Sequence, residues 1–255
     1  MSGVAVVLHQ FRFDQKVFWR NPAAVFFTAL LPLLFLFLLA TIFKDTHISG
    51  VDVSGATYYV PAILTLAVIS ATTVKLATNL PTEREAGQLK RVRGTPLPPA
   101  AFVAGRVGNS LVISVIMVVL VSVIGALLYG VTIPTDTLPA MLVTLAVGAF
   151  SFSCLGFALA AAIPTAEAAP AVTNATVLPL YFLSGVFIPQ DELPDGVLDF
   201  ADLFPIRHFF EALFTAWDPH TVGAGFEWGD LAVVAAWGLL GLVIAVRFFR
   251  WEPRR

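Results

Sequence analysis

Six long runs of apolar residues are the feature that most constrains how this chain folds. The hydrocarbon core of a bilayer is about 30 Å thick, and about 20 helical residues are needed to cross it. Each apolar run is close to that length, and the runs lie at 25–43, 58–80, 107–129, 138–163, 171–188 and 231–249. We therefore predict an all-α integral membrane protein with six transmembrane helices, forming a single transmembrane domain over residues 1–255.

The overall composition agrees with a membrane location. Hydrophobic residues make up 58% of the chain and charged residues 13%, which is too apolar for a soluble domain of 255 residues. A cleaved signal peptide is the alternative interpretation of the first apolar run. The part before that run, about 24 residues, is long for a signal peptide, and no small-x-small cleavage site follows the run. We expect a retained helix.

The positions of Lys and Arg predict the orientation, because cytoplasmic loops carry an excess of both. With a cytoplasmic amino terminus, the basic residues on the inner side are Arg12, Lys16, Arg20, Arg84, Lys90, Arg91, Arg93, Arg106, Arg247, Arg250, Arg254 and Arg255. The outer side has Lys44 and Arg207, and nine acidic residues gather there between Asp191 and Asp230. This pattern predicts an even number of crossings with both termini in the cytoplasm.

An amphipathic segment precedes the first apolar run. Over residues 4–20, apolar and charged residues alternate with a period near 3.6, which indicates a helix. The apolar face carries Val4, Val7, Leu8, Phe11 and Phe18, and the charged face carries His9, Arg12, Lys16 and Arg20. We predict an interfacial helix on the membrane surface, and a solvated helix packed on another subunit is the alternative. The Asn21-Pro22 pair ends this helix.

The loop at 81–106 is the longest and most densely charged element on the predicted cytoplasmic side. Acidic residues come early in it and basic residues late, which suits the dipole of a short helix. We predict that this helix begins near Thr82 and ends at Gly94, because Pro96 prevents its continuation. The Pro98-Pro99 pair is expected to shorten the start of the third transmembrane helix. Alternatively, the basic residues serve only to keep the loop inside.

Two blocks of sequence resemble one known family. The first block, in this loop, reads Glu83-Arg84-Glu85-x-Gly87-x-Leu89, followed by Thr95-Pro96-Leu97. The second comprises Leu183-Ser184-Gly185-Val186-Phe187-Ile188-Pro189, Leu193-Pro194, Phe204-Pro205-Ile206-Arg207-His208-Phe209 and Glu211-Ala212-Leu213. The blocks and their separation are similar to those of ATP-binding-cassette (ABC) transporter permeases of the type-2 exporter family, and the resemblance covers essentially the whole chain.

The resemblance implies a transmembrane subunit paired with a second copy or a related permease. The low number of lysines beside many arginines suggests a GC-rich bacterial genome, and we therefore expect a bacterial plasma membrane. ATP and Mg would be bound by separate cytoplasmic ATPase subunits. Carried onto this sequence, the coupling residues toward the ATPase would be Glu83, Arg84, Glu85, Gly87, Leu89 and Arg91. Leu89 would enter a groove on the ATPase, and the charged residues beside it would make polar contacts that fix the register.

The sequence also indicates that the chain does not hydrolyse ATP itself. A phosphate-binding P-loop requires Gly-Lys followed by Ser or Thr, and none of the four lysines follows a glycine. The histidines are scattered without metal-ligand spacing, so we expect neither a metal site nor a cofactor in this chain. Catalytic residues and a nucleic-acid partner are not expected either.

The segment at 189–229 is too apolar for an ordinary external loop and is interrupted by three prolines. We predict short re-entrant helices that dip into the outer leaflet, shielded by protein. The resemblance assigns an external gate to Phe187, Pro189 and Phe204. The alternative is a structural cap over the helix ends.

Polar and small residues inside the apolar runs have simple explanations. Lys75 lies near the inner end of the second run, where it can snorkel to the headgroups, and a substrate contact is the alternative. Small residues between Gly148 and Ala161 are expected to let neighbouring helices approach closely.

The apolar runs offer Phe, Leu and Val with little fixed charge, so we expect a hydrophobic or amphipathic substrate, a drug or a lipid. A glycan or lipid-linked glycan is the alternative, because some relatives export glycans. A secondary transporter is a second reading, but it usually needs an intramembrane acid for its coupling ion. A membrane-embedded transferase is a third, and it would need clustered Asp or His near a membrane face.

Overall fold

The structure, a computed structural model, describes residues 3–44, 46–48, 53–95, 97–249 and 251–252. Arg250, Arg254 and Arg255 of the predicted inner basic set lie outside these residues. The helices are α1 (Gly3–Trp19), α2 (Pro22–Phe43), α3 (Gly55–Ile69), α4 (Lys75–Glu85), α5 (Gln88–Arg93), α6 (Pro99–Tyr129), α7 (Leu138–Ala162), α8 (Ala169–Leu183), α9 (Asp195–Ala201), α10 (Pro205–Trp217) and α11 (Trp228–Phe248).

Three short elements complete the fold. A π-helical turn, η1 (Ser70–Val74), joins α3 and α4 into one long helix, and a 3-10 turn, η2 (Gln190–Glu192), precedes α9. The strands β1 (His47–Ile48) and β2 (Val53–Ser54) pair antiparallel, with Ile48 opposite Val53. The described chain is therefore nearly all helical, as the sequence predicts.

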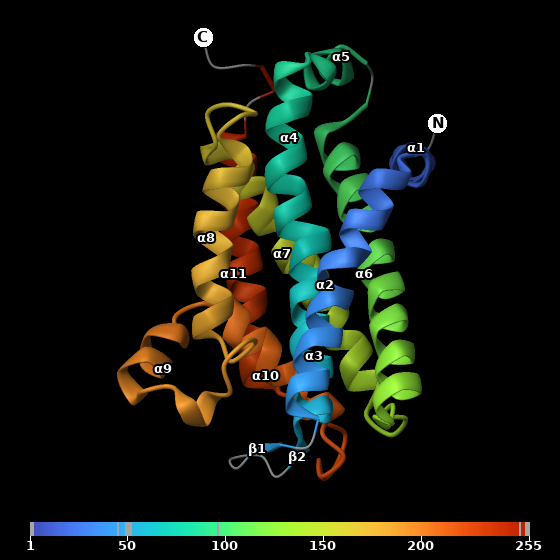
Figure 1. Cartoon of the computed structure of the whole chain (residues 1–255). Helices are drawn as coiled ribbons and strands as arrows, with labels where there is room; N and C mark the ends of the chain where they lie inside the picture. Colours follow the sequence, from blue (N-terminus) through green and yellow to red (C-terminus); the bar gives the residue numbers. More distant parts are fainter. Residues whose placement is uncertain (1–2, 45, 49–52, 96, 250, 253–255) are drawn as a thin grey trace.

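The long helices run between two ends of the molecule (Figure 1). The start of α1 and the end of α11 lie at the end that carries α5, and we call this the α5 end. The β1–β2 hairpin, α9 and α10 lie at the opposite end, which we call the α10 end (Figure 1). The described residues of the predicted inner basic set therefore gather at the α5 end, and the acidic stretch lies at the α10 end.

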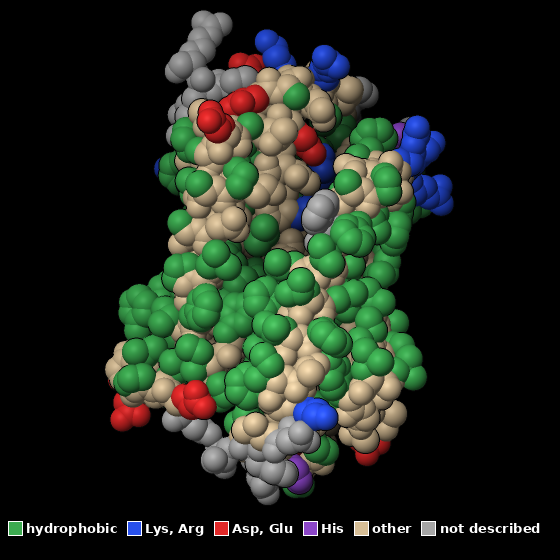
Figure 2. All heavy atoms as spheres, viewed as in Figure 1, with side chains coloured by type: hydrophobic (Ala, Val, Ile, Leu, Met, Phe, Trp, Pro, Cys, Tyr) green, Lys and Arg blue, Asp and Glu red, His purple; other side chains and the backbone are tan. Residues whose placement is uncertain are grey.

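Five helical segments of the described chain are long and apolar enough to cross a bilayer. They are Pro22–Phe43, Gly55–Glu85, Pro99–Tyr129, Leu138–Ala162 and Trp228–Phe248. The remaining predicted crossing, the fifth, at 171–188, corresponds to α8, which is apolar but has only 15 residues. Hydrophobic side chains form a broad band around the middle, and charged side chains lie toward the two ends (Figure 2). The fold is that of a multi-pass membrane protein.

The boundaries of two helices differ from the predicted ones for local reasons. The third long helix is not shortened by its proline pair, because Pro99 occupies the first turn of α6, where a missing N–H costs no hydrogen bond. The fifth ends early, at Leu183, because Gly185 adopts a positive φ of 81° that helical residues do not take. The apolar segment at 189–229 forms η2, α9 and α10, and α10 packs into the main core.

Small residues let α7 and α11 pack closely, as the sequence predicts. The buried face of α11 consists of Leu231, Val234, Gly238, Gly241 and Ala245. A Cβ atom added at Gly238 would lie 2.7 Å from the Ser151 Cα of α7, and one added at Gly148 would lie 2.1 Å from the Phe209 ring of α10. Helix association in lipid depends on such close approach, because lipid is as apolar as the side chains.

We expect Gly238→Ala to destabilise the protein by about 1–3 kcal/mol, because the new methyl group overpacks the α7–α11 contact. Thermal unfolding in detergent, followed by size-exclusion chromatography, measures the effect. Gly229→Ala on the same helix is the matched control, since a Cβ atom there meets nothing within 4 Å. Equal melting temperatures for the two variants would contradict this account of the packing.

Candidate functional site

The loop predicted to contact an ATPase forms two helices that meet at Gly87. Gly87 adopts a left-handed conformation with φ of 70°, which a side chain disfavours, so the chain turns there between α4 and α5. The prediction of one helix starting near Thr82 is therefore wrong, because α4 continues from the preceding membrane segment. The predicted end is confirmed: α5 stops at Gly94, whose N–H donates to the Lys90 carbonyl.

Arg84 and Glu85 hold the turn between α7 and α8. The Arg84 side chain is buried, and its Nη2 donates to the carbonyl oxygens of Ile163 at 2.7 Å and Pro164 at 3.1 Å. Those carbonyls end α7, so a cation there also suits the helix dipole. One Glu85 carboxylate oxygen accepts a hydrogen bond from the Ala166 N–H at 2.8 Å. Both side chains thus tie the end of α4 to the neighbouring turn.

Leu89 faces into the protein rather than outward. It is 1% exposed and belongs to a buried cluster with Leu76, Leu80, Phe102, Phe157, Ala160 and Ala245. The prediction that Leu89 enters a groove on a partner does not fit this position, because its apolar surface is already covered. Leu89 instead anchors α5 against α4, α6, α7 and α11. Arg91 and its basic neighbours Lys90 and Arg93 are exposed on α5, as is Gln88.

A partly buried ion cluster joins α4, α6 and α1. The Arg106 Nη2 of α6 lies 2.6 Å from a Glu83 carboxylate oxygen of α4, and its Nε lies 3.6 Å from an Asp14 carboxylate oxygen of α1. The Asp14 side chain is 2% exposed and accepts a hydrogen bond from Gln10. Glu83 is therefore directed at α6 rather than at the surface.

Lys75 of α4 is covered by α1. Its ammonium nitrogen is buried and lies 4.6 Å from the centre of the Phe18 ring of α1, which favours a cation–π contact. The snorkelling predicted for Lys75 is thus wrong, because α1 lies across the route to the headgroups.

Burial raises the pKa of the Asp14 carboxyl above its usual range, although the Arg106 charge and the Gln10 hydrogen bond oppose the shift.

Asp14 is the functional candidate that the sequence reading overlooked. The face of α1 packed on the other helices carries Gln10, Asp14 and Phe18, which follow one another at four-residue spacing. The predicted apolar face shares only part of this surface, and Val4 and Leu8 are exposed. The sequence does offer one signal for Asp14: it is an acidic residue in a segment whose other charged residues are basic.

Two of the three predicted gate residues, Phe187 and Phe204, lie against different helices at the α10 end. The Phe187 ring contacts Phe35 of α2 at 5.0 Å and Phe182 of α8 at 4.9 Å between ring centres. The Phe204 ring stacks on Trp237 of α11 at 6.2 Å. Pro189 precedes the η2 turn. The Phe187 and Phe204 rings therefore pack on different helices rather than on each other.

Two hydroxyl groups attach the Phe187 segment to α3. The Tyr58 hydroxyl donates to the Gly185 carbonyl at 2.7 Å, and the Tyr59 hydroxyl donates to the Phe187 carbonyl at 3.4 Å. On the α10 side, His208 contacts Asp230 of α11 at 2.6 Å. Burial raises the pKa of Glu211, which hydrogen bonds with Gln190 and faces Arg207.

The fold and the site together define a multi-pass helical membrane protein in which buried guanidinium groups tie one charged end to the membrane helices. The family model of the ABC-2 type transporter matches residues 8–216. The chain therefore belongs to the ABC-2 type transporter family, and the resemblance predicted from its two sequence blocks is confirmed. It is also similar to a protein of Bacillus subtilis (strain 168) named "Putative transport permease YvfS", at 22% identity over 233 residues, which cover 91% of this chain and 92% of that protein.

We expect Arg106→Met to destabilise the protein by roughly 3 kcal/mol, because it leaves the Glu83 and Asp14 carboxylates buried without their cation. Thermal unfolding in detergent checks this. Arg20→Met, an exposed arginine of the same region, is the matched control and should change stability little. An unchanged melting temperature for Arg106→Met would show that the ion cluster contributes nothing to the fold.

Replacing Asp14 should alter the pH dependence of stability. Because the folded pKa of Asp14 is raised, its stabilising contribution is fully present below the ordinary value of 3.8 and is lost as pH rises through the raised value. Asp14→Asn should therefore gain stability relative to the wild type as the pH is raised above 3.8, until the raised pKa is passed. Melting temperatures of both proteins across that range provide the measurement, and parallel curves would argue against the shift.

Proposed function

We propose that this chain is the membrane subunit of an ABC exporter that draws energy from a separate ATPase. Family membership supports the transporter class, and the arrangement at the α5 end supports the coupling. In this proposal the α5 end faces the cytoplasm, where the ATPase subunits bind ATP and Mg, and both termini lie on that side. The single observation that carries the proposal is the attachment of this end to the membrane helices: Leu89 buries its side chain among theirs, and Arg84 fixes the end of α4 from which α5 continues.

In the proposed mechanism, the exposed basic edge of α5 contacts the ATPase and its buried side transmits the movement. Arg91, Lys90 and Arg93 are exposed and available for polar contacts, while Leu89 keeps α5 fixed to the core. Movement of α4 reaches α6 and α1 through the Glu83–Arg106–Asp14 cluster. The result is a rigid-body shift of the helices, a common way in which membrane transporters open a path.

The translocation path is proposed to run along the face formed by α2, α4 and α8. Exposed amides occur there within apolar helices, at Asn79 of α4 and Asn174 of α8. Polar groups are costly against hydrocarbon, so such a face requires cover by protein or water. A second copy of this chain, or a related permease, would supply the opposite wall. The α8 helix would be the sixth crossing, and the helices of 189–229 would re-enter the outer leaflet.

The substrate proposed is hydrophobic or amphipathic, a drug or a lipid, because the membrane helices offer mainly apolar surface. Phe187 would act as a gate between α2 and α8, because its ring contacts both helices. Pro189 follows closely and would set the direction of the chain leaving the gate. Phe204, which stacks on α11, would stabilise the external helices instead of closing the path.

The experiment is co-purification with the ABC ATPase from the native membrane, followed by reconstitution and measurement of ATP hydrolysis. The combined change of Lys90, Arg91 and Arg93 to Gln should weaken ATPase binding about tenfold or more, because it removes three surface charges. Lys44→Gln at the α10 end is the control and should bind as the wild type does.

Leu89→Ala separates anchoring from docking. It should lower the melting temperature, since removing a buried leucine side chain costs about 2–5 kcal/mol. It should also reduce the stimulation of ATP hydrolysis by substrate more than it reduces ATPase binding. Transport driven by an ion gradient without ATP, or full coupling in the triple Gln variant, would refute the proposed function.

A further inference from the structure

A pocket that contains a buried lysine lies between α2 and the long α3–α4 helix beside it (Figure 1). Its volume is about 320 Å³, at the lower end of the range typical of ligand pockets. The α2 wall includes Ala24, Thr28 and Leu31, and the opposite wall includes Lys75, Thr78 and Asn79. Of the described residues that line this space, only Lys75 carries a charge. We call it the Lys75 pocket.

The Lys75 ammonium is buried without a hydrogen-bond partner. Its nitrogen is shielded from solvent and makes no hydrogen bond within the described part of the protein. The Phe18 ring covers it from the α1 side at 4.6 Å. The charges that act on it are those of Asp14, Glu83 and Arg106, but both carboxylates contact Arg106 directly. An ammonium has three N–H donors, and burying them without an acceptor is costly. The pocket therefore lacks an acceptor that a bound anion would supply.

The other polar groups of the Lys75 pocket add both donors and acceptors. The Thr28 and Thr78 hydroxyls donate to carbonyls one turn earlier in their own helices, at 2.7 and 2.8 Å. Because their hydrogens are used in this way, their oxygens can only accept from a ligand. Asn79, which is exposed at the pocket, carries amide N–H donors. This set fits an anionic group attached to a skeleton that carries a hydroxyl.

An irregular helical turn forms part of the pocket wall. The π turn η1 ends at Val74, directly before Lys75, and both Ser70 and Val74 line the pocket. The Lys75 N–H reaches back five residues to the Ser70 carbonyl instead of the usual four. Such turns inside α-helices are frequent at functional sites.

The Lys75 pocket joins the face proposed for translocation, since Asn79 belongs to both. Its volume holds a head group but not a whole amphipathic molecule. Along α2, Leu31, Leu34 and Leu38 follow at a spacing of three and four residues, so they lie on one side of the helix, and all three are exposed. This apolar strip begins at the pocket and suits a hydrocarbon tail. Ten residues separate Lys75 from the end of α4 at Glu85, a rise of about 15 Å.

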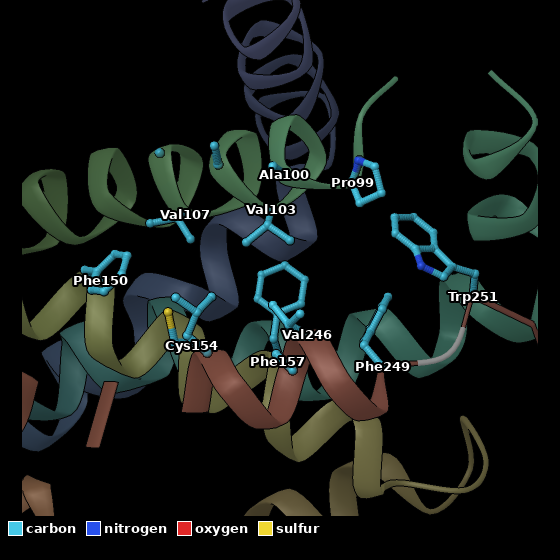
Figure 3. Close-up of a pocket in the computed structure, with 14 residues that line it drawn as sticks. Pro99, Ala100, Val103, Val107, Phe150, Cys154, Phe157, Val246, Phe249 and Trp251 are labelled. Atoms are coloured by element: carbon cyan, nitrogen blue, oxygen red, sulfur yellow. The ribbon is translucent and has the colours of Figure 1, made fainter. Parts of the chain in front are cut away.

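A larger groove between α6 and α11 lacks these features (Figure 3). Its volume is about 730 Å³, and its walls include Val103, Phe157 and Val246. No charged side chain is among the described residues that line it. This groove has nothing that would select an anionic head group, and it therefore provides a control.

We propose that the Lys75 pocket binds the anionic head group of an amphipathic molecule, a phosphate or a carboxylate, while the tail lies along the apolar strip of α2. The Lys75 ammonium donates hydrogen bonds to the anionic oxygens, and the threonine oxygens accept from a hydroxyl of the ligand. This inference rests on the proposed function in one respect, namely that the bound molecule is the one transported. It narrows the substrate class to anionic amphipaths.

Lysophosphatidic acid is a suitable probe, because it combines a phosphate monoester, one free hydroxyl and one acyl chain. Binding of the radiolabelled lipid to the purified chain in maltoside micelles is measured by scintillation proximity. Two competitors separate the parts of the probe: monoacylglycerol lacks the phosphate, and glycerol 3-phosphate lacks the chain. Monoacylglycerol should need about tenfold higher concentration or more, the loss expected for a hydrogen bond to a charged group. Glycerol 3-phosphate should not compete over the same range.

Variants with matched controls locate the site. Lys75→Met should weaken binding of lysophosphatidic acid about tenfold or more, whereas Lys75→Arg, which keeps the charge, should retain most of it. Lys16→Met removes an exposed lysine and should have no effect. Ala24→Phe fills the Lys75 pocket and should abolish binding, whereas Ala104→Phe fills the α6–α11 groove and should not. Melting temperatures identify variants that do not fold, and the competition by monoacylglycerol needs only the wild type.

Equal competition by monoacylglycerol, or undiminished binding in folded Lys75→Met, would overturn the proposal. A lower melting temperature of Lys75→Met with unchanged binding would show that Lys75 only balances the charges of Asp14 and Glu83. ATP-dependent transport of lysophosphatidic acid by the reconstituted complex with the ATPase tests the proposed function separately. Selective binding without such transport would contradict the exporter assignment and leave the pocket in place. Transport without selective binding would contradict the pocket alone.

Discussion

The position of α1 depends on the Arg106 guanidinium. The face that α1 presents to α6 carries Gln10 and Asp14, and the Asp14 carboxylate would be costly to bury without a cation beside it. Arg106 supplies that cation and shares it with Glu83 at the end of α4. Once α1 is held there, Phe18 covers Lys75, and the chain enters α2 through the capping residue Asn21. An electrostatic contact between three helices thus sets the arrangement of the whole α5 end.

The residues at the α5 end fall into two groups with different roles. Arg84 and Leu89 are buried and connect α4 and α5 to the rest of the protein, while the basic residues of α5 stay on the surface. A partner that pulls on the exposed edge of α5 would therefore move a body that is already attached to α4, α6, α7 and α11. Gly87 permits the change of direction between α4 and α5. As a result, one face of α5 packs on the protein and the other is exposed.

Most of the fold was accessible from the sequence because its main signals are local. Apolar length predicts the long helices, and the Lys and Arg pattern agrees with the grouping of α1, α5 and the end of α11 at one end (Figure 1). The side-chain orientations of Arg84 and Leu89 could not be predicted from the sequence. Arg84 is oriented by the carbonyls of Ile163 and Pro164, and Leu89 is oriented by side chains from four other helices. The partner of Asp14 lies 92 residues away at Arg106, so no local pattern reports it.

The short length of α8 has a consequence for the surrounding membrane. Fifteen residues rise about 22 Å, several ångströms less than an average hydrocarbon core. Lipid that meets this helix must become thinner there, or protein must replace it beyond Leu183. Thinning of the lipid would bring the two aqueous phases closer together beside Asn174. In the proposed arrangement, in which α8 is a crossing, hydrophobic mismatch at this helix would make the bilayer a weaker barrier on that side before any conformational change takes place.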